Sequence, residues 1–136
     1  MVLSGPLERF LKTVHDVHAT GAAVPETSYY PAISRLLEDV GSALTPKVRP
    51  VVNIRDQGSG IPDLGLFVVR PGGPVTAPEP MVASIPERGA VEVKPPAQDV
   101  DKVATSRQVR NYLARYGKVI VTTMREWTLI GTDSSG

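Results

Sequence analysis

Apolar residues recur every three or four positions in two stretches near the start of the chain, the spacing of an amphipathic helix. The first stretch, between Pro6 and Gly21, has its apolar positions at Leu7, Phe10, Leu11, Val14 and Val17. The second has them at Tyr29 or Tyr30, Ile33, Leu36, Leu37 and Val40. Thr27 or Ser28 is the expected N-cap of the second helix, Pro31 suits its first turn, and Gly41 is its expected stop. We therefore expect two helices before any strand.

Beyond Pro46 the pattern becomes that of β-strands, because β-branched residues are frequent and the apolar spacing shortens. A first strand is predicted from Val48 to Ile54, ahead of a Gln-Gly-Ser-Gly turn at positions 57–60. A second strand begins just after Asp63, with apolar positions at Leu64, Leu66, Phe67, Val68 and Val69. The intervening turn favours an antiparallel hairpin.

Residues 71–87 contain prolines at positions 71, 74, 78, 80 and 86, so they cannot form a central strand or the interior of a helix. We expect an extended loop there. Two roles stay open for it: the flank of a binding groove, or a tolerated surface insertion. A third strand is predicted at residues 90–94, where Pro95 and Pro96 end it abruptly.

The last part of the chain predicts one helix and two strands. Asp99 or Asp101 is the expected N-cap of a helix that runs to Tyr116, with Gly117 as its stop. Residues 118–123 and 126–131 form the final strands. The order is α-α-β-β-β-α-β-β, which predicts an α/β fold with a mixed sheet flanked by helices. The crossover helix should make the third and fourth strands parallel.

Composition limits the alternatives. With 136 residues the chain has room for one core, which we assign to residues 1–131, with 132–136 as a linker or an artificial end. No apolar run suits a membrane span and no signal peptide is evident, so we expect a cytoplasmic protein without membrane contact. The absence of cysteine excludes disulfides, thiol nucleophiles and cysteine-based metal sites. The net charge of +1 gives no strong attraction for polyanions, so nucleic-acid binding would be local or helped by a partner.

Two short motifs place carboxylates and a lysine on predicted strands. Pro62-Asp63 precedes the second strand, and Glu92-Val93-Lys94 lies in the third. Since side chains alternate along a strand, Glu92 and Lys94 should share one face while Val93 points into the core. Two carboxylates on neighbouring strands can hold Mg²⁺, and a nearby lysine can act on an attacking water. Neither motif is rare by itself, and the alternative is a pair of strand-edge charges that only solubilise the sheet.

Taken together, these motifs resemble the PD-(D/E)xK nuclease superfamily. The resemblance extends to residues 26–32 (Glu-Thr-Ser-Tyr-Tyr-Pro-Ala), residues 60–63 (Gly-Ile-Pro-Asp) and the helical pair Gln108 and Tyr112. In this larger pattern, from about Leu7 to Gly131, the chain is similar to the N-terminal nuclease domain of single-polypeptide restriction-modification enzymes. Such a domain precedes an adenine methyltransferase, sometimes with a helicase between them. The resemblance implies a restriction-endonuclease-like sheet core.

The resemblance also implies roles for individual residues. Asp63 and Glu92 would bind Mg²⁺, or alternatively Mn²⁺, with the Val93 carbonyl as a third contact. Lys94 would orient or help to deprotonate the attacking water and stabilise charge on the phosphate. Glu26 matches an additional acidic residue of the family that assists metal or water binding. Glu38 is a weaker candidate for that role, because it falls on the solvent side of its helix.

Gln108 and Tyr112 lie four residues apart and therefore on one helical face. Such a pair can bind a phosphate near the metal, and the alternative is a buried tyrosine beside a glutamine. Other basic groups could contact phosphates but are also typical of a solvated surface: Lys47, Arg49, Arg55, Lys102, Arg107, Arg110 and Arg115. His15 and His18 could form half a metal site, but no third ligand is evident in the sequence.

The resulting hypothesis is a Mg²⁺-dependent DNA endonuclease domain, a hydrolase of phosphodiester bonds that serves as the cleavage module of a restriction-modification enzyme. Its partners would be DNA and the methyltransferase, helicase and target-recognition modules of the same polypeptide. One alternative is a stand-alone repair, recombination or phage nuclease, which a reading frame that stops at Gly136 would favour. Another is a catalytically inert nuclease-fold domain for DNA binding or assembly. The presence of Asp63, Glu92 and Lys94 together argues against that last alternative.

Overall fold

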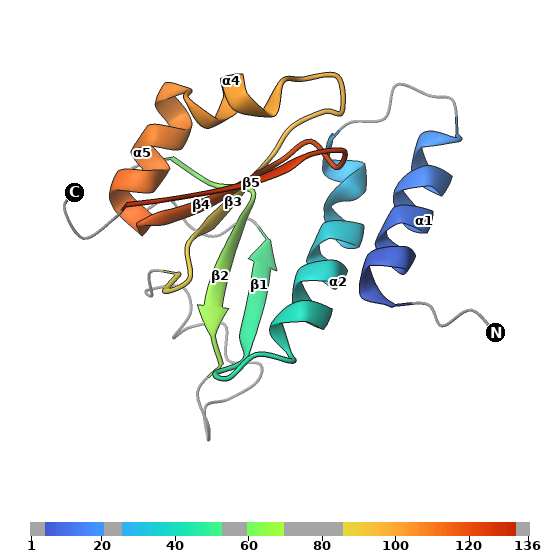
Figure 1. The fold of residues 1–136 in the computed structure, drawn as a ribbon, viewed down its shortest axis with the longest axis horizontal. Coiled ribbons are helices and arrows are strands. Elements are labelled where there is room, and N and C mark those ends of the chain that lie inside the picture. Colours follow the sequence, from blue (N-terminus) through green and yellow to red (C-terminus); the bar gives the residue numbers. More distant parts are fainter. Residues whose placement is uncertain (1–4, 21–25, 53–59, 70–85, 133–136) are drawn as a thin grey trace.

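A computed structural model describes residues 5–20, 26–52, 60–69 and 86–132 (Figure 1). The described chain forms a five-stranded sheet with helices on both faces. Its helical segments are α1 (Pro6–His18), the short 3₁₀ helix η1 (Glu26–Tyr29), α2 (Tyr30–Gly41), α4 (Val100–Ala104) and α5 (Arg107–Tyr116). Its strands are β1 (Val48–Val52), β2 (Leu64–Val68), β3 (Ala90–Val93), β4 (Lys118–Thr122) and β5 (Trp127–Gly131).

The strands lie in the sheet in the order in which they occur in the sequence, from β1 to β5. β1 and β2 pair antiparallel, as do β2 with β3 and β4 with β5. Only β3 and β4 are parallel, because α4 and α5 carry the chain back across the sheet between them. The predicted fold class is therefore confirmed: a mixed α/β arrangement consistent with a restriction-endonuclease-like core.

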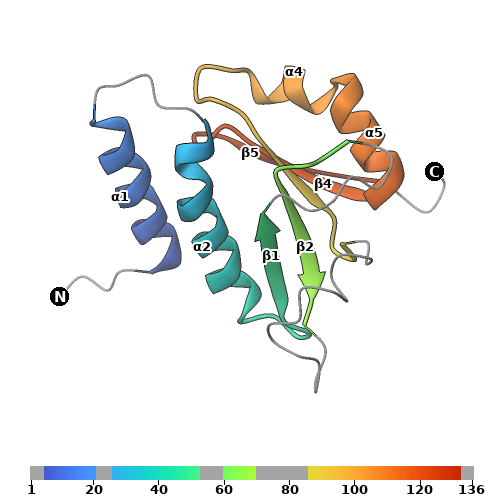
Figure 2. The ribbon, with the colours of Figure 1, turned by 180° about the vertical axis from the view of Figure 1, so that it is seen from behind.

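Two helical layers bury the two faces of the sheet, as the opposite views in Figures 1 and 2 show. α1 and α2 cover one face, where Phe10, Ile33, Leu64 and Val93 belong to one buried cluster. α4 and α5 cover the other, where Tyr112 and other side chains form a second cluster. Every residue of β3 is buried, as expected for a central strand that is covered on both faces.

The prediction of one helix from Asp99 or Asp101 to Tyr116 is wrong. The chain forms two helices, because Ser106 has an extended backbone and caps a new helix, its hydroxyl accepting a hydrogen bond from the Val109 N–H at 3.2 Å. Asp99, one of the two expected caps, does begin α4, accepting a hydrogen bond from the Asp101 N–H at 2.9 Å. Gly117 ends α5 in the left-handed conformation, as predicted.

The predicted N-cap of the second helix is also wrong. Thr27 and Ser28 lie within η1, and α2 follows directly with Tyr29 at the cap position and without a capping side chain. Gly41 is the last residue of α2, as expected. The physical reason differs from the expected one, because a side chain at Gly41 would overlap the backbone carbonyl of Val48.

The strand boundaries in the described residues match the predicted ones to within a residue or two. β2 ends at Val68, and the N–H of Val69 bonds to the Lys47 carbonyl at 2.8 Å. Lys94 follows β3 directly and its N–H bonds to the Thr122 carbonyl at 2.9 Å. Predictions for Gly21, Ile54, most of the 57–60 turn and nearly all of the 71–87 loop fall outside the described residues. Among the described helices, none has the length and apolar character that a bilayer crossing requires.

Candidate active site

Asp63 stands at the start of β2, directly across from β3. The register pairs Leu64 with Val91, so one further step along the two antiparallel strands brings Asp63 opposite Glu92. One Asp63 oxygen, Oδ2, accepts a hydrogen bond from the backbone N–H of Val93 at 2.6 Å. The other, Oδ1, accepts one from the hydroxyl of Tyr30. The two predicted carboxylates are therefore neighbours, as the sequence motifs require.

Glu92 lies within the sheet and is 3% exposed. Its Oε1 is 3.2 Å from the ammonium nitrogen of Lys94, whose side chain keeps 26% of its surface accessible. Val93, between them, is fully buried in the cluster under α1 and α2. The strand thus has the alternation predicted from the sequence. A buried carboxylate is stable only when it is paired, and here the paired lysine also reaches solvent.

Tyr112 extends the site towards α5. Its hydroxyl accepts a hydrogen bond from the Gln108 side-chain amide at 2.8 Å, while Tyr112 itself is fully buried. Burial, together with the negative charges of Glu92 and Asp63, raises the pKa of Tyr112 to about 12, against the lowering effect of the hydrogen bond from Gln108. The predicted pair therefore exists, and its phenol is within the field of both carboxylates.

Gly60 closes over this phenol. It has a positive φ of 93°, and a side chain there would come within 3.5 Å of the Tyr112 hydroxyl oxygen. Gly60 begins the segment that leads through Pro62 to Asp63, so α5 and the Asp63 strand are packed directly together. Gln108 is exposed, which leaves it accessible from solvent.

The donor set suits a hard divalent cation. Asp63 and Glu92 offer carboxylate oxygens from adjacent strands, the ligand type that Mg²⁺ and Mn²⁺ prefer. Within the described ranges, no three histidine, aspartate or glutamate side chains gather closely enough to hold a metal by themselves. Mg²⁺ commonly keeps several waters and takes only one or two carboxylates from a protein. Two carboxylates with a lysine beside them therefore suit Mg²⁺, which would keep several of its waters, better than a metal ion whose ligands all come from the protein.

The remaining acidic candidates lie at α2 and its entrance. Glu26 begins η1, and its side chain is outside the described part of the structure. Glu38 is exposed on α2, where its Oε1 lies 3.4 Å from a guanidinium nitrogen of Arg49. The expectation that Glu38 faces solvent is therefore confirmed. Its partner Arg49 belongs to β1, so this ion pair lies between α2 and the sheet.

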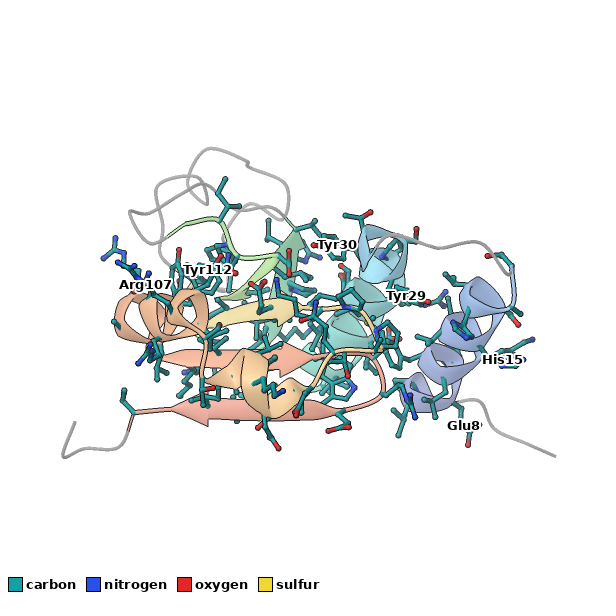
Figure 3. The ribbon with its side chains drawn as sticks, turned by 90° about the horizontal axis from the view of Figure 1, so that it is seen from above. Glu8, His15, Tyr29, Tyr30, Arg107 and Tyr112 are labelled. Atoms are coloured by element: carbon teal, nitrogen blue, oxygen red, sulfur yellow. The ribbon has the colours of Figure 1, made fainter. Side chains whose placement is uncertain are left out.

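Tyr30 is a site residue that the sequence did not single out. It is 8% exposed and its hydroxyl donates to the Asp63 carboxylate, so it fixes a candidate metal ligand from α2. Figure 3 shows Tyr30 and Tyr112 reaching from α2 and α5 on opposite sides of the central strands. The only sequence signal was the Tyr29-Tyr30 pair ahead of Pro31, and periodicity could not decide which tyrosine faced the core. Both are buried.

The basic candidates are spread over the surface. Arg107, Arg110 and Arg115 are exposed on α5, and Lys102 is exposed on α4. His15 and His18 are exposed on α1, and no group of three potential ligands includes them among the described residues. Arg55 lies outside the described residues. Contact of any of these groups with phosphate stays a prediction.

Comparison with known proteins supports the fold. No protein-family model matches the sequence, and no curated protein matches it. A solved structure described as "cryoEM structure DrdV-DNA complex" is similar, with a TM-score of 0.61 and 20% sequence identity. The similarity covers 93% of this chain and 11% of the other, so this chain spans about a tenth of that protein's length. At this identity the likeness shows a shared fold.

Proposed function

We propose that this chain is a Mg²⁺-dependent DNA endonuclease domain of the PD-(D/E)xK type, the cleavage module of a larger restriction-modification enzyme. The observation that carries the proposal is the placement of Asp63 opposite Glu92, with Lys94 paired to Glu92 at 3.2 Å. Such an arrangement can hold a cation and a cationic side chain beside one phosphate. The similar solved structure, which its description calls a DNA complex, supports DNA as the substrate.

In this proposal Asp63 and Glu92 would hold Mg²⁺, with the Val93 carbonyl as a further possible ligand. When bound, such an ion polarises a phosphoryl oxygen and makes a water more acidic. Lys94 orients the attacking water and stabilises negative charge on the phosphate, since its ammonium group is both anchored by Glu92 and open to solvent. The oxygen of water would bond to phosphorus and release a proton, the bond from phosphorus to the leaving sugar oxygen would break, and the sugar oxygen would take up a proton.

The residues around this centre position it. Tyr30 and the Val93 N–H orient the Asp63 carboxylate, as hydrogen-bond donors commonly do for metal ligands. Gln108, exposed and bonded to Tyr112, can donate to a phosphate at the α5 side. Glu26 stays a proposed assistant in metal or water binding. DNA specificity and further cofactors would belong to other modules of the polypeptide.

The proposal is tested by plasmid nicking with Mg²⁺, with Mn²⁺ and with EDTA. Activity should require the metal, and Asp63→Ala, Glu92→Ala and Lys94→Ala should each lower it at least 100-fold. Glu38→Ala is the matched control, because it removes an exposed carboxylate that is paired to Arg49. It should cut as the wild type does. Metal-dependent nicking that persists in all three site variants would sink the proposal.

Metal binding provides a second measurement that does not depend on turnover. Titration of Mn²⁺, followed by its electron paramagnetic resonance signal, should give one site in the wild type. Asp63→Ala and Glu92→Ala should abolish that site, while Glu38→Ala should retain it. A wild-type chain that binds no Mn²⁺ and nicks no DNA would instead support the catalytically inert alternative.

A further inference from the structure

A cavity of about 310 Å³ opens between α1 and the segments that follow β3 and β4. Its walls come from α1, from η1, from the segment after β3 and from the turn between β4 and β5. The lining residues are Leu11, Val14, His15, His18, Tyr29, Pro96, Met124 and Arg125. Its volume is at the lower end of the range for small-molecule sites in proteins, so it suits one small molecule or one residue of a polymer.

Two backbone segments carry both lining residues of the cavity and residues of the candidate site. Tyr29 is followed by Tyr30, whose hydroxyl donates to Asp63. Pro96 comes two residues after Lys94, so their α-carbons are at most about 7 Å apart. The hydrogen bond from the Lys94 N–H to the Thr122 carbonyl, 2.9 Å long, joins that segment to the strand that leads into Met124 and Arg125. Residues of the cavity and of the candidate site therefore lie near the carboxyl ends of β3 and β4.

The chemistry of the walls is divided. Leu11, Val14, Tyr29, Pro96 and Met124 provide an apolar floor, of which Tyr29 and Met124 are almost completely buried. Met124 is held there in a left-handed backbone conformation, with φ of 67°, and its N–H bonds to the Thr122 hydroxyl at 3.0 Å. The polar groups at the exposed rim, two histidines and an arginine, are all potential cations.

None of the residues described around the cavity is acidic. An anionic group with a flat apolar part therefore complements it in both charge and polarity. A nucleotide has this character, since it combines a phosphate with a sugar and a base. In Figure 3 the labelled side chains run from Arg107 and Tyr112 on α5, through Tyr30 and Tyr29, to His15 and Glu8 on α1. Tyr30 donates to Asp63 of the candidate site, whereas Tyr29 and His15 line the cavity.

We infer that this cavity binds a nucleotide of the DNA strand next to the bond to be cut. Arg125 contacts its phosphate, with His15 and His18 beside it, and the apolar floor receives the sugar and base. This inference rests on the proposed function, because it takes DNA as the substrate. It adds a binding site on α1 and the β4–β5 turn that lies outside the PD-(D/E)xK motifs.

The test is a titration of the 136-residue chain with 5′-phosphorylated dithymidine in EDTA, so that no cleavage occurs. The chain has three methionines, and ¹³C-methyl labelling gives a signal for Met124 that Met124→Leu assigns. The Met124 methyl and the ring signals of His15 and His18 should shift and saturate. Arg125→Ala should weaken binding about tenfold through loss of a charged hydrogen bond.

A matched pair of variants on α1 separates the cavity from the general surface. Leu11→Glu places a negative charge in the cavity wall and should weaken binding at least as much as Arg125→Ala does. Leu7→Glu changes a similarly exposed leucine, 59% against 52%, outside the lining, and should bind as the wild type does.

The inference is overturned if the dinucleotide does not shift Met124, if Leu11→Glu and Leu7→Glu behave alike, or if inorganic phosphate binds equally well. These results are independent of those for the proposed function. If the chain binds the dinucleotide at Met124 but neither nicks DNA nor binds Mn²⁺, the cavity remains a nucleotide site and the proposed nuclease activity is contradicted. Nicking with no response at Met124 does the reverse.

Discussion

The Asp63 carboxylate is held by donors from two different elements. The Tyr30 hydroxyl reaches it from α2, and the Val93 N–H reaches it from β3. Each carboxylate oxygen can still accept from a second partner. The Asp63 side chain is thus oriented before a metal binds. Such orientation strengthens metal binding, because no free energy is lost in ordering the carboxylate.

Tyr30→Phe removes only the hydroxyl and keeps the ring in the core. We expect it to weaken Mn²⁺ binding about 10- to 100-fold, the usual effect of losing a hydrogen bond to a metal ligand. Calorimetry or paramagnetic resonance measures this directly. Tyr29→Phe makes the same change in the neighbouring buried tyrosine and should leave Mn²⁺ affinity unaltered. Equal effects of the two variants would refute the positioning role.

Tyr112 predicts a dependence of stability on alkaline pH. Its folded pKa is about 12 against an ordinary value of 10.0, so folding favours the protonated phenol. The contribution to stability is therefore complete below pH 10 and is lost as the pH rises from about 10 to about 12, where the unfolded chain ionises first. Urea denaturation at pH 9 and pH 11 should show a larger loss for the wild type than for Tyr112→Phe. Equal losses would contradict this assignment.

Helix boundaries in this protein depend on contacts that lie outside the helices. Ser106 divides the predicted single helix because its hydroxyl satisfies the Val109 N–H, and the new direction lets α5 carry Tyr112 against β3 and β4. At the end of α2, Gly41 lets the helix approach the backbone of β1. Local capping decides the first boundary, and tertiary packing decides the second.

Gly41→Ala tests that close approach. Replacing a helical glycine by alanine ordinarily stabilises a protein by about 1 kcal/mol. Here the new methyl group would overlap the Val48 carbonyl, which is backbone and cannot turn aside. We therefore expect the opposite sign, a loss of about 2 kcal/mol in the free energy of unfolding. Gly5→Ala is the control, since nothing lies within 4 Å of the added atom there, and thermal denaturation compares the two.

The molecule as a whole offers DNA little general attraction. Its net charge is +1, and several of its cations are already paired, as Arg9 is with Asp39 and Arg49 with Glu38. Specific binding of DNA depends on many neutralised phosphates or on contacts to base edges. With 15 lysines and arginines nearly balanced by 14 aspartates and glutamates, a single small domain provides little net attraction of this kind. In the proposed function, target choice is therefore assigned to other modules.

The isolated chain should accordingly bind duplex DNA weakly and without sequence preference. We expect a dissociation constant on the order of 10 µM or weaker at physiological salt, and a steep fall in affinity as salt increases. Fluorescence anisotropy at several salt concentrations, with two unrelated duplexes, measures both properties. A nanomolar, salt-insensitive and sequence-specific complex would contradict the proposal that this domain cleaves DNA while other modules choose the target.

Much of the architecture was predictable from local patterns. The apolar periodicity of α1 and α2, the β-branched runs and the Pro95-Pro96 stop fixed the elements, and the crossover fixed the parallel pair. The Asp63 and Glu92 motifs were predictable as candidates because strand alternation puts Glu92 and Lys94 on one face. Their placement opposite one another in the sheet depended on the pairing of β2 with β3, which the sequence only favoured.

The contributions missing from the sequence are those between distant elements. The Tyr30 hydroxyl meets Asp63 across 33 positions, the field of Glu92 acts on Tyr112 from another element, and the cavity combines four separate segments. Periodicity and motifs report the conformation and facing of neighbouring residues. They carry no information on which hydroxyl meets which carboxylate. The sequence by itself therefore determined most of the elements and the candidate acidic residues, while only the tertiary structure decided what orients those residues and what lies beside them.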